Sequence, residues 1–202
     1  MLGLPFFRKT SPFLKGRRIS LRPPKISDYE EWSELRRISR TFLEPWEPSW
    51  APDELERSGW RYRMDRARSE HKAGTGIGLL LIDNTTDRLA GGITLGNIRR
   101  GVAQSCQIGY WTGKPYAGRG YMVEALELVI PFAFDVLRLH RVEAACIPSN
   151  ARSVRVLEKA GFTREGLAQS YLRINGAWQD HFLYARVCDD TRKSTRHLKS
   201  TE

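Results

Sequence analysis

Hydrophobic and polar positions divide the chain into segments with strand-like and helix-like periodicity. Short apolar or alternating runs predict strands over residues 17–22, 76–83, 89–98, 105–112, 141–147, 166–174 and 177–187. The last two form a hairpin across Asn175-Gly176, a pair typical of a type I′ turn. Helical spacing predicts helices over residues 28–40 and 53–72, a long apolar helix after residue 122, and a short helix over 151–160. Antiparallel strands are therefore expected before the long helix, and a further strand and a hairpin after it.

Local signals mark several helix ends. Side-chain caps are expected from Ser27 or Asp28 for the first helix and from Asp53 for the second. In the short helix, the Asn150 side chain should accept a hydrogen bond from the amide of Ser153. Its other end should be a Schellman motif, with Gly161 following the helix and Phe162 packing on Leu157.

The long helix has one narrow polar stripe. Glu124, Glu127, Asp135 and Arg138 share it with Pro131, while apolar residues, Val136 among them, cover the rest. This pattern predicts a helix buried on most of its surface. Pro131 should bend the helix at a solvent-facing position, where water can satisfy the carbonyl that the proline leaves without a donor.

The turn before the long helix is rich in glycine. Residues 117–122 read Ala-Gly-Arg-Gly-Tyr-Met, which places two glycines where backbone amides can converge at a helix N-terminus. Such amides suit a diphosphate or a similar anion. A Walker A loop requires Gly-Lys-Ser/Thr, and a dinucleotide fingerprint requires a glycine where Val123 stands. Neither fits, and taken alone the two glycines are more often only a tight turn between a strand and a helix.

Residues 42–50 combine aromatic rings, carboxylates and three prolines, which predicts an ordered loop. Trp46 and Trp50 offer π faces, and Glu44 and Glu47 offer negative charge, so this loop could bind a cationic substrate. The alternative is that the aromatic rings only pin the loop to the core.

Composition narrows the function without fixing it. The 202 residues carry a net charge of +10, which favours acidic partners such as RNA or a polyanionic cofactor, and the basic run 57–68 could contact rRNA. The usual explanation of such a run is a solvated surface. The three cysteines are widely spaced and indicate neither a zinc site nor a disulfide framework. We therefore expect no metal, and we expect a reducing, cytoplasmic location. No apolar run is long enough to cross a membrane.

The domain organisation is expected to be simple. Residues 1–14 form an N-terminal arm, residues 15–188 one domain, and residues 189–202 a basic tail without apolar content that is expected to be disordered. The sequence leaves both a monomer and a homodimer open.

Four pieces of the chain together resemble the GCN5-related N-acetyltransferase (GNAT) superfamily. They are the strand IGYWT, the loop PYAGRGYMVEA, the segment PSNARSVRVLEKAGFTREG and the final hairpin. Within the superfamily, FLEPWEP, YWTGKPYAGRGYM, NARSVRVLEKAGF and YLRINGAWQDHFLYA are most similar to the RimJ-type ribosomal-protein-alanine N-acetyltransferases. The resemblance covers residues 17–187 and favours a functional role for the glycines over a simple turn.

The resemblance implies a mixed, mostly antiparallel sheet with helices on both faces, splayed between residues 107–112 and 142–147. Acetyl-CoA would lie in the splay. By position, its pantetheine would contact Tyr110, Trp111 and Thr112, and its diphosphate would contact the amides of Ala117, Gly118, Arg119, Gly120, Tyr121 and Met122. Asn150 and Ser153 would lie near the thioester sulfur and the pantetheine arm.

Two positions depart from the family pattern. Pro115 stands where many members have Gln or Arg at the start of the loop, and Leu157 stands where many have a tyrosine that acts as general acid. A site built mainly from backbone amides tolerates the first change. After the second, Ser153 is the nearest available proton donor for the departing thiolate.

The implied reaction is attack of a neutral amine on the thioester. An α-amine with a pKa near 7.8 is about 10–15% neutral at pH 7, against about 0.04% for a lysine. An N-terminal acceptor therefore needs only a weak base or a water relay. The candidates are Glu44, Glu47, Asp180 and His181, although a cross-strand hydrogen bond is the commoner role for the last two.

Three functions remain open. The resemblance favours acetyl transfer to the N-terminal alanine of a ribosomal protein. A second possibility keeps acetyl-CoA and changes the acceptor to a small amine, such as a polyamine, an amino acid or an aminoglycoside. The third is a ribosome- or RNA-binding module that has lost catalysis, against which the retained glycines and Asn150 speak.

Overall fold

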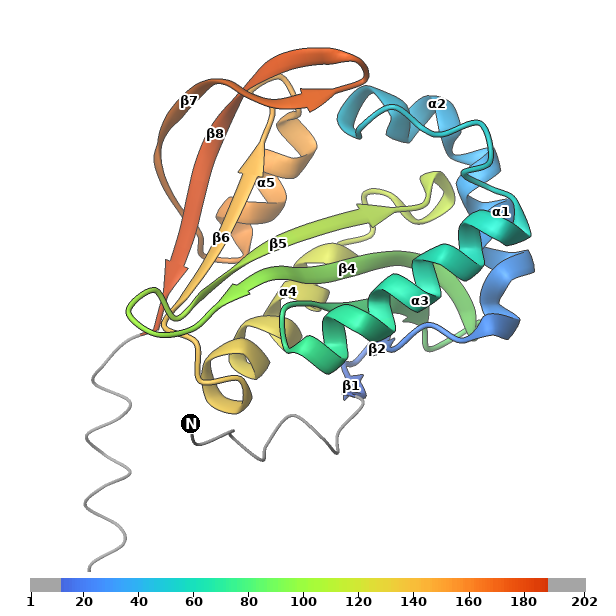
Figure 1. Ribbon diagram of the computed structural model, residues 1–202, viewed down its shortest axis with the longest axis horizontal. Coiled ribbons are helices and arrows are strands. Elements are labelled where there is room, and N and C mark those ends of the chain that lie inside the picture. Colours follow the sequence, from blue (N-terminus) through green and yellow to red (C-terminus); the bar gives the residue numbers. More distant parts are fainter. Residues whose placement is uncertain (1–11, 189–202) are drawn as a thin grey trace, which may run out of the picture.

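The computed structural model describes residues 12–188, which form one eight-stranded sheet flanked by helices (Figure 1). The strand order is β1-β2-β3-β4-β5-β6-β8-β7, and every neighbouring pair is antiparallel except β5 and β6. The strands are β1 (Leu14–Lys15), β2 (Ile19–Arg22), β3 (Ile77–Asp83), β4 (Arg88–Arg99), β5 (Ser105–Thr112), β6 (Arg141–Cys146), β7 (Thr163–Ile174) and β8 (Ala177–Val187). The expected mixed, mostly antiparallel fold is confirmed. Leu14, assigned to the arm, pairs with Leu21, while residues 1–11 and the tail 189–202 lie outside the described part of the chain.

Within residues 12–188, five α-helices flank the sheet. They are α1 (Tyr29–Ile38), α2 (Arg40–Leu43), α3 (Arg57–Ala73), α4 (Tyr121–Pro131) and α5 (Ala151–Lys159). Side chains of β3 alternate between the two faces, so Leu80 and Ile82 pack with α1 and α3, whereas Leu79 and Leu81 pack with α4. Among residues 12–188, no helix is long and apolar enough to span a bilayer.

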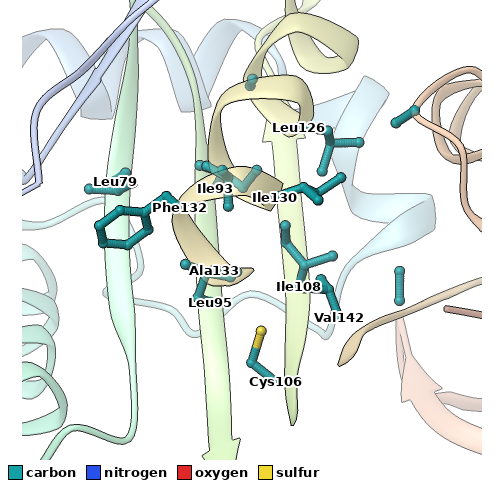
Figure 2. Close-up of a cluster of buried hydrophobic side chains, with 14 of the residues drawn as sticks. Leu79, Ile93, Leu95, Cys106, Ile108, Leu126, Ile130, Phe132, Ala133 and Val142 are labelled. Carbon is teal, nitrogen blue, oxygen red and sulfur yellow. The ribbon is translucent and has the colours of Figure 1, made fainter. Parts of the chain in front are cut away.

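The larger core lies between α4 and the middle strands. Figure 2 shows Leu126 and Ile130 of α4 in one cluster with Ile93 and Ile108, which come from β4 and β5. The packing fixes α4, and therefore the glycine turn before it, relative to the end of β5.

The sheet opens between β5 and β6. Their parallel pairing begins at Ser105 with Arg141 and ends at Gln107 with Glu143, although β5 continues to Thr112. Beyond Gln107, the β6 side of β5 therefore has no neighbouring strand in the described structure. This is the splay that the resemblance predicted.

Several local predictions are confirmed. The Asn150 side chain accepts the amide of Ser153 at 3.1 Å. At the other end of α5, the amide of Phe162 bonds the carbonyl of Leu157 at 3.0 Å and that of Gly161 bonds Glu158 at 3.0 Å, which is the Schellman pattern. Asn175 and Gly176 both have positive φ, at 44° and 81°, as a type I′ turn requires.

One predicted side-chain cap and one predicted helix start are wrong, although α1 does begin directly after Asp28. Asp28 does not cap α1 with its side chain, because its carboxylate pairs with the Arg22 guanidinium at 2.7 and 2.8 Å. Asp53 does not begin α3, because its carbonyl accepts the amide of Glu56 in a turn and the helix starts only at Arg57.

The segment 42–50 is more regular than predicted. Helix α2 runs into a 3-10 turn at Glu44–Trp46, and the irregular chain begins only at Glu47. Pro45 lies in the first positions of that turn, where its missing N–H removes no hydrogen bond.

The predicted polar stripe is correct at Glu127, Pro131, Asp135 and Arg138, which are exposed, and wrong at Glu124, while the predicted apolar set is wrong at Val136. Glu124 is only 9% exposed, because Arg18 binds it. Val136, expected in the core, is 59% exposed. It ends a π-helical turn, Phe132–Val136, in which the amide of Leu137 reaches back five residues to Phe132, and this wider turn shifts the phase of the side chains.

We expect Glu124→Gln to lower the free energy of unfolding at pH 7 by about 2 kcal/mol, because the carboxylate accepts the Arg18 amide at 2.7 Å and Nε at 2.8 Å. Burial would raise the pKa of Glu124, but hydrogen bonds from Arg18 and Ile19 outweigh it and lower the pKa. The stabilisation is therefore full above the unfolded-state pKa of about 4.3 and is lost as the pH falls through the lower folded-state pKa. Urea denaturation at pH 7 and at lower pH measures this. Glu127→Gln, on the exposed side of α4, is the control, and a pH-independent difference would contradict the assignment.

Candidate active site

A cavity of about 620 Å³ occupies the splay. Its walls are the end of β5, the glycine turn with the start of α4, the end of β6, one side of α5, the segment 42–47 and the β7–β8 hairpin. In Figure 1, α2 and the tip of the hairpin lie together above β5. There the amide of Asn175 bonds the carbonyl of Glu47 at 2.9 Å, which ties the two upper walls together.

The glycine turn is held by Arg18 from behind. Gly118 and Gly120 both have φ of +77°, a conformation that residues with a side chain rarely adopt. The Arg18 guanidinium donates to the carbonyls of Arg119 at 2.9 Å and Gly120 at 3.4 Å. In a trans peptide the N–H points opposite to the C=O, so the amides of Gly120 and Tyr121 point away from Arg18.

The amides of this turn have no partners. Within residues 12–188, no group accepts a hydrogen bond from the backbone N–H of residues 118–122. Gly118 and Gly120 line the cavity, with Ala117, Tyr121 and Met122 beside them, and no atom lies within 4 Å of a Cβ built at Gly118. Unpaired amides at the N-terminus of α4, with space beside them, form an anion site. Arg119, the remaining predicted member, does not line the cavity; its guanidinium lies 5.5 Å from the Tyr116 ring.

The end of β5 forms the adjacent wall. Tyr110, Trp111 and Thr112, the predicted pantetheine residues, all line the cavity. They pair with β4 on one side, and β6 has diverged from them on the other. An extended ligand therefore has access to one edge of β5, as in the addition of a strand.

Three polar side chains meet at the base of the splay. The hydroxyls of Tyr110 and Ser153 are 2.9 Å apart, and Cys146 lines the cavity with them. Burial raises the pKa of Tyr110, against a smaller opposite effect of Ser153, and burial likewise raises the pKa of Cys146. Both groups therefore remain protonated at neutral pH. Asn150, which caps α5, lines the cavity beside Ser153.

The two residues that depart from the family pattern, Leu157 and Pro115, lie in different parts of the structure. Leu157 is fully buried in the core and offers no proton, whereas Ser153, one turn earlier on α5, faces the cavity. Pro115 lies in a 3-10 turn, Lys114–Tyr116, that leads into the glycine turn.

The predicted acceptor residues divide into two groups. Trp46 and Glu47 line the cavity, whereas Glu44 and Trp50 do not. Glu44 accepts a hydrogen bond from Arg40 at 2.6 Å. The Trp50 ring lies 4.2 Å from the Arg36 guanidinium, and its indole N–H donates to Glu47 at 2.8 Å, so Trp50 pins the segment as the alternative interpretation held.

Arg36 organises this wall from beneath. It is 5% exposed, and it donates to both carboxylate oxygens of Glu47 at 2.7 Å. Its guanidinium also lies 5.0 Å from the Trp111 ring. Glu47 is therefore already engaged by a cation of the chain itself.

Asp180 and His181 differ although they are neighbours. Asp180 accepts the amide of Ser170 at 2.8 Å and does not line the cavity, which is the cross-strand role considered for it. His181 lines the cavity and is 3% exposed. Its Nδ1 lies 2.9 Å from the carbonyl oxygen of Gln179, and its ring is edge-on to Tyr171.

Sequence reasoning missed several residues at this site. Arg18 and Arg36 support the two walls from positions distant in sequence, and no local pattern marks them. Arg152, Arg155 and Lys159 of α5 line the same cavity as the glycine turn and bring positive charge to it. Their spacing of three and four residues on one helix face was an available signal.

Comparison with known proteins agrees with this geometry. Residues 18–163 match the model of the Acetyltransferase (GNAT) domain family. A probable N-acetyltransferase of Bacillus subtilis, YjcK, is 39% identical over 177 residues, which are 88% of this chain and 98% of the relative. The [ribosomal protein uS5]-alanine N-acetyltransferase of Escherichia coli is 34% identical over 167 residues, 82% of this chain and 86% of the relative.

Solved structures give the same result. Mycobacterium smegmatis RimJ in complex with CoA-disulfide superposes with a TM-score of 0.84 at 31% identity, covering 89% of each chain. The ribosomal-protein-S5-alanine acetyltransferase of Vibrio fischeri superposes with a TM-score of 0.82 at 32% identity, covering 89% of this chain and 98% of the other. The chain belongs to the GNAT family and is an N-acetyltransferase of the RimJ/RimL type.

Proposed function

We propose that this protein transfers the acetyl group of acetyl-CoA to the N-terminal α-amine, with alanine as the preferred first residue, of a ribosomal protein in the cytoplasm. One observation carries the proposal: the unpaired amides of residues 118–122 and the side chains of Ser153 and His181 belong to one cavity. The names of the E. coli and V. fischeri relatives support the alanine acceptor.

The residues present fit acetyl-CoA. The amides of Gly118, Gly120 and Tyr121 would bind its diphosphate, and the open edge of β5 at Tyr110 and Trp111 would hold its pantetheine. Arg152, Arg155 and Lys159 would add positive charge along the same wall. Bound there, acetyl-CoA supplies an activated acyl carbon and a thiolate leaving group.

Ser153 would stabilise the leaving sulfur. Tyr110 stays protonated because burial raises its pKa, so it can donate its hydroxyl hydrogen to Ser153. Ser153 is then free to direct its own hydrogen toward the sulfur. A hydrogen bond to a developing anion is stronger than one between neutral groups, so this arrangement favours the transition state.

His181 is the base that the geometry favours among the four candidates. The Gln179 carbonyl can only accept a hydrogen bond, so the Nδ1 atom beside it carries the proton. In the neutral imidazole, Nε2 then has a free lone pair and can accept a proton from the attacking amine, directly or through water. The carboxylates of Glu44, Glu47 and Asp180 already accept hydrogen bonds from Arg40, Arg36 and Ser170.

The basic surface gives less support to RNA binding. Four of the five arginines of α3 pair with nearby carboxylates: Arg57 with Glu30, Arg63 with Glu54, Arg66 with Glu70 and Arg68 with Asp65. The charge of this helix is therefore largely neutralised. Ribosome contact remains a prediction that rests on the net charge of the chain.

The direct test follows CoA release with a thiol reagent. The protein is incubated with acetyl-CoA and a peptide that begins with alanine, the same peptide blocked at its N-terminus, or a polyamine. We expect release with the free peptide alone, and mass spectrometry should place the acetyl group on the α-amine. Release only with the polyamine would instead support the small-amine function, and failure to bind acetyl-CoA would support a non-catalytic module.

We expect Ser153→Ala to lower kcat by about 10- to 100-fold, since a hydrogen bond to a charged group is worth about 1.5–3 kcal/mol. The KM for the acceptor should stay within about twofold, because Ser153 would act on the sulfur rather than on the amine. Tyr110→Phe should show a smaller loss of the same kind. Steady-state kinetics measures both, and an unchanged kcat in Ser153→Ala would remove this residue from the mechanism.

A further inference from the structure

A second cavity, of about 340 Å³, adjoins the first on the face of the sheet that carries α3. Thr94, Gly96 and Asn97 of β4, Gln107 of β5, and Arg66 and Glu70 of α3 line it. Ile108 and Gly109 line both cavities, so both cavities border this part of β5. Figure 1 shows the C-terminal part of α3 beside β4 and β5, away from α2 and the hairpin tip.

Strand register connects the two cavities along one face. Residues opposite each other on neighbouring strands point to the same side, as do residues two apart on one strand. His181 shares a face with Leu183, which lies opposite Ala145 of β6. Glu143, two residues earlier on β6, lies opposite Gln107, and Gln107 lies opposite Gly96. The face that presents the candidate base is therefore continuous with the floor of the second cavity.

Two glycines, Gly96 and Gly109, leave the floor of the second cavity without side chains. No atom lies within 4 Å of a Cβ built at Gly96 or at Gly109, and neither has the positive φ that would require glycine. Their effect is to leave room above β4 and β5, into which a ligand backbone can descend.

We propose that the second cavity binds the acceptor polypeptide beyond its first residues, as an extended segment that continues from the reaction cavity over Gly109 and Gly96. This proposal rests on the proposed function and narrows the acceptor to a polypeptide. A small amine would leave the second cavity unused.

The chemistry of the lining suits a polypeptide backbone. The side chains of Asn97 and Gln107, 2.7 Å apart, and the exposed Thr94 offer donors and acceptors, which an extended chain needs at every residue. Arg66 and Glu70 pair at 2.7 Å, so the lining has no unbalanced cluster of positive charge for a polyphosphate. Its side chains are mostly polar, which disfavours an acyl chain.

Acceptor length provides the test. Wild-type enzyme is assayed with alaninamide and with a six-residue peptide that begins with alanine, and the peptide should have a kcat/KM about tenfold higher or more, the equivalent of one or two hydrogen bonds. Gly96→Leu should remove most of this advantage by raising the peptide KM. Its kinetics with alaninamide and its KM for acetyl-CoA should stay within about twofold of wild type.

A matched variant controls for the substitution itself. Gly166 of β7 also has no atom within 4 Å of a built Cβ, and it lines neither cavity. The Gly166→Leu variant should therefore retain the higher kcat/KM for the longer acceptor. Equal activity of wild type on the two acceptors, or retention of the full advantage of the peptide in Gly96→Leu, would overturn the proposal that the second cavity binds the acceptor. The proposed function would stand in either case. Failure of wild type to acetylate either acceptor would overturn both.

Discussion

Replacing His181 by alanine is expected to lower kcat/KM for an N-terminal acceptor by about 10²- to 10⁴-fold, the usual contribution of a positioned general base. The loss should appear mainly in kcat, and binding of acetyl-CoA should be nearly unchanged, because the proposed diphosphate contacts are backbone amides of the glycine turn and do not involve His181. Steady-state kinetics, with calorimetric binding of acetyl-CoA, measures these effects.

Two comparisons separate a base from a packing residue. Asp180→Ala removes the neighbouring carboxylate, which bonds the amide of Ser170 outside the cavity, and should keep kcat/KM within about threefold of wild type. Added imidazole should restore part of the activity of His181→Ala, because the vacated space opens into the cavity. If imidazole restores nothing and Glu47→Gln shows the larger loss, the base is Glu47.

Features that depend on neighbours in sequence were predictable. The caps of α5 and the type I′ turn each need a few residues in one conformation, and both agree with the structure. The unpaired amides of residues 118–122 follow from the same local logic, because the first N–H groups of a helix have no internal partner.

Features that depend on distant charges were not predictable in this way. Arg18 and Glu124 are 106 positions apart, and their contact turns a residue of the expected polar stripe into a buried support for the glycine turn. Arg36 similarly binds Glu47, which from sequence alone was available to a substrate cation. The sequence around a charged residue does not identify the distant residue with which its side chain will pair.

The missing side-chain cap of α1 and the wrong start of α3 have the same origin. Asp28 and Asp53 are good capping residues by type, but their side chain or carbonyl is used elsewhere. The exposed position of Val136 has a different cause, since one π-helical turn after Pro131 is enough to break the periodicity on which the prediction depended.

The proposed cofactor site makes the strongest prediction about binding. Gly118→Val should raise the Kd for acetyl-CoA by about 10-fold. The valine must either hold φ near +77°, which costs about 1–2 kcal/mol, or rotate the turn and remove its amides from the diphosphate. Isothermal titration calorimetry with CoA and with dephospho-CoA measures the loss, which should be of similar size for both because both retain the diphosphate.

Gly101→Val is the matched control. Gly101 has φ of +65° and, like Gly118, no atom within 4 Å of a built Cβ, but it lies in the turn between β4 and β5 and lines neither cavity. The two variants should therefore lose similar amounts of unfolding free energy, and only Gly118→Val should lose affinity. Equal Kd values in the two variants would mean that the amides of residues 118–122 do not hold the diphosphate, and the positive charge of α5 would then be the remaining anchor for the nucleotide.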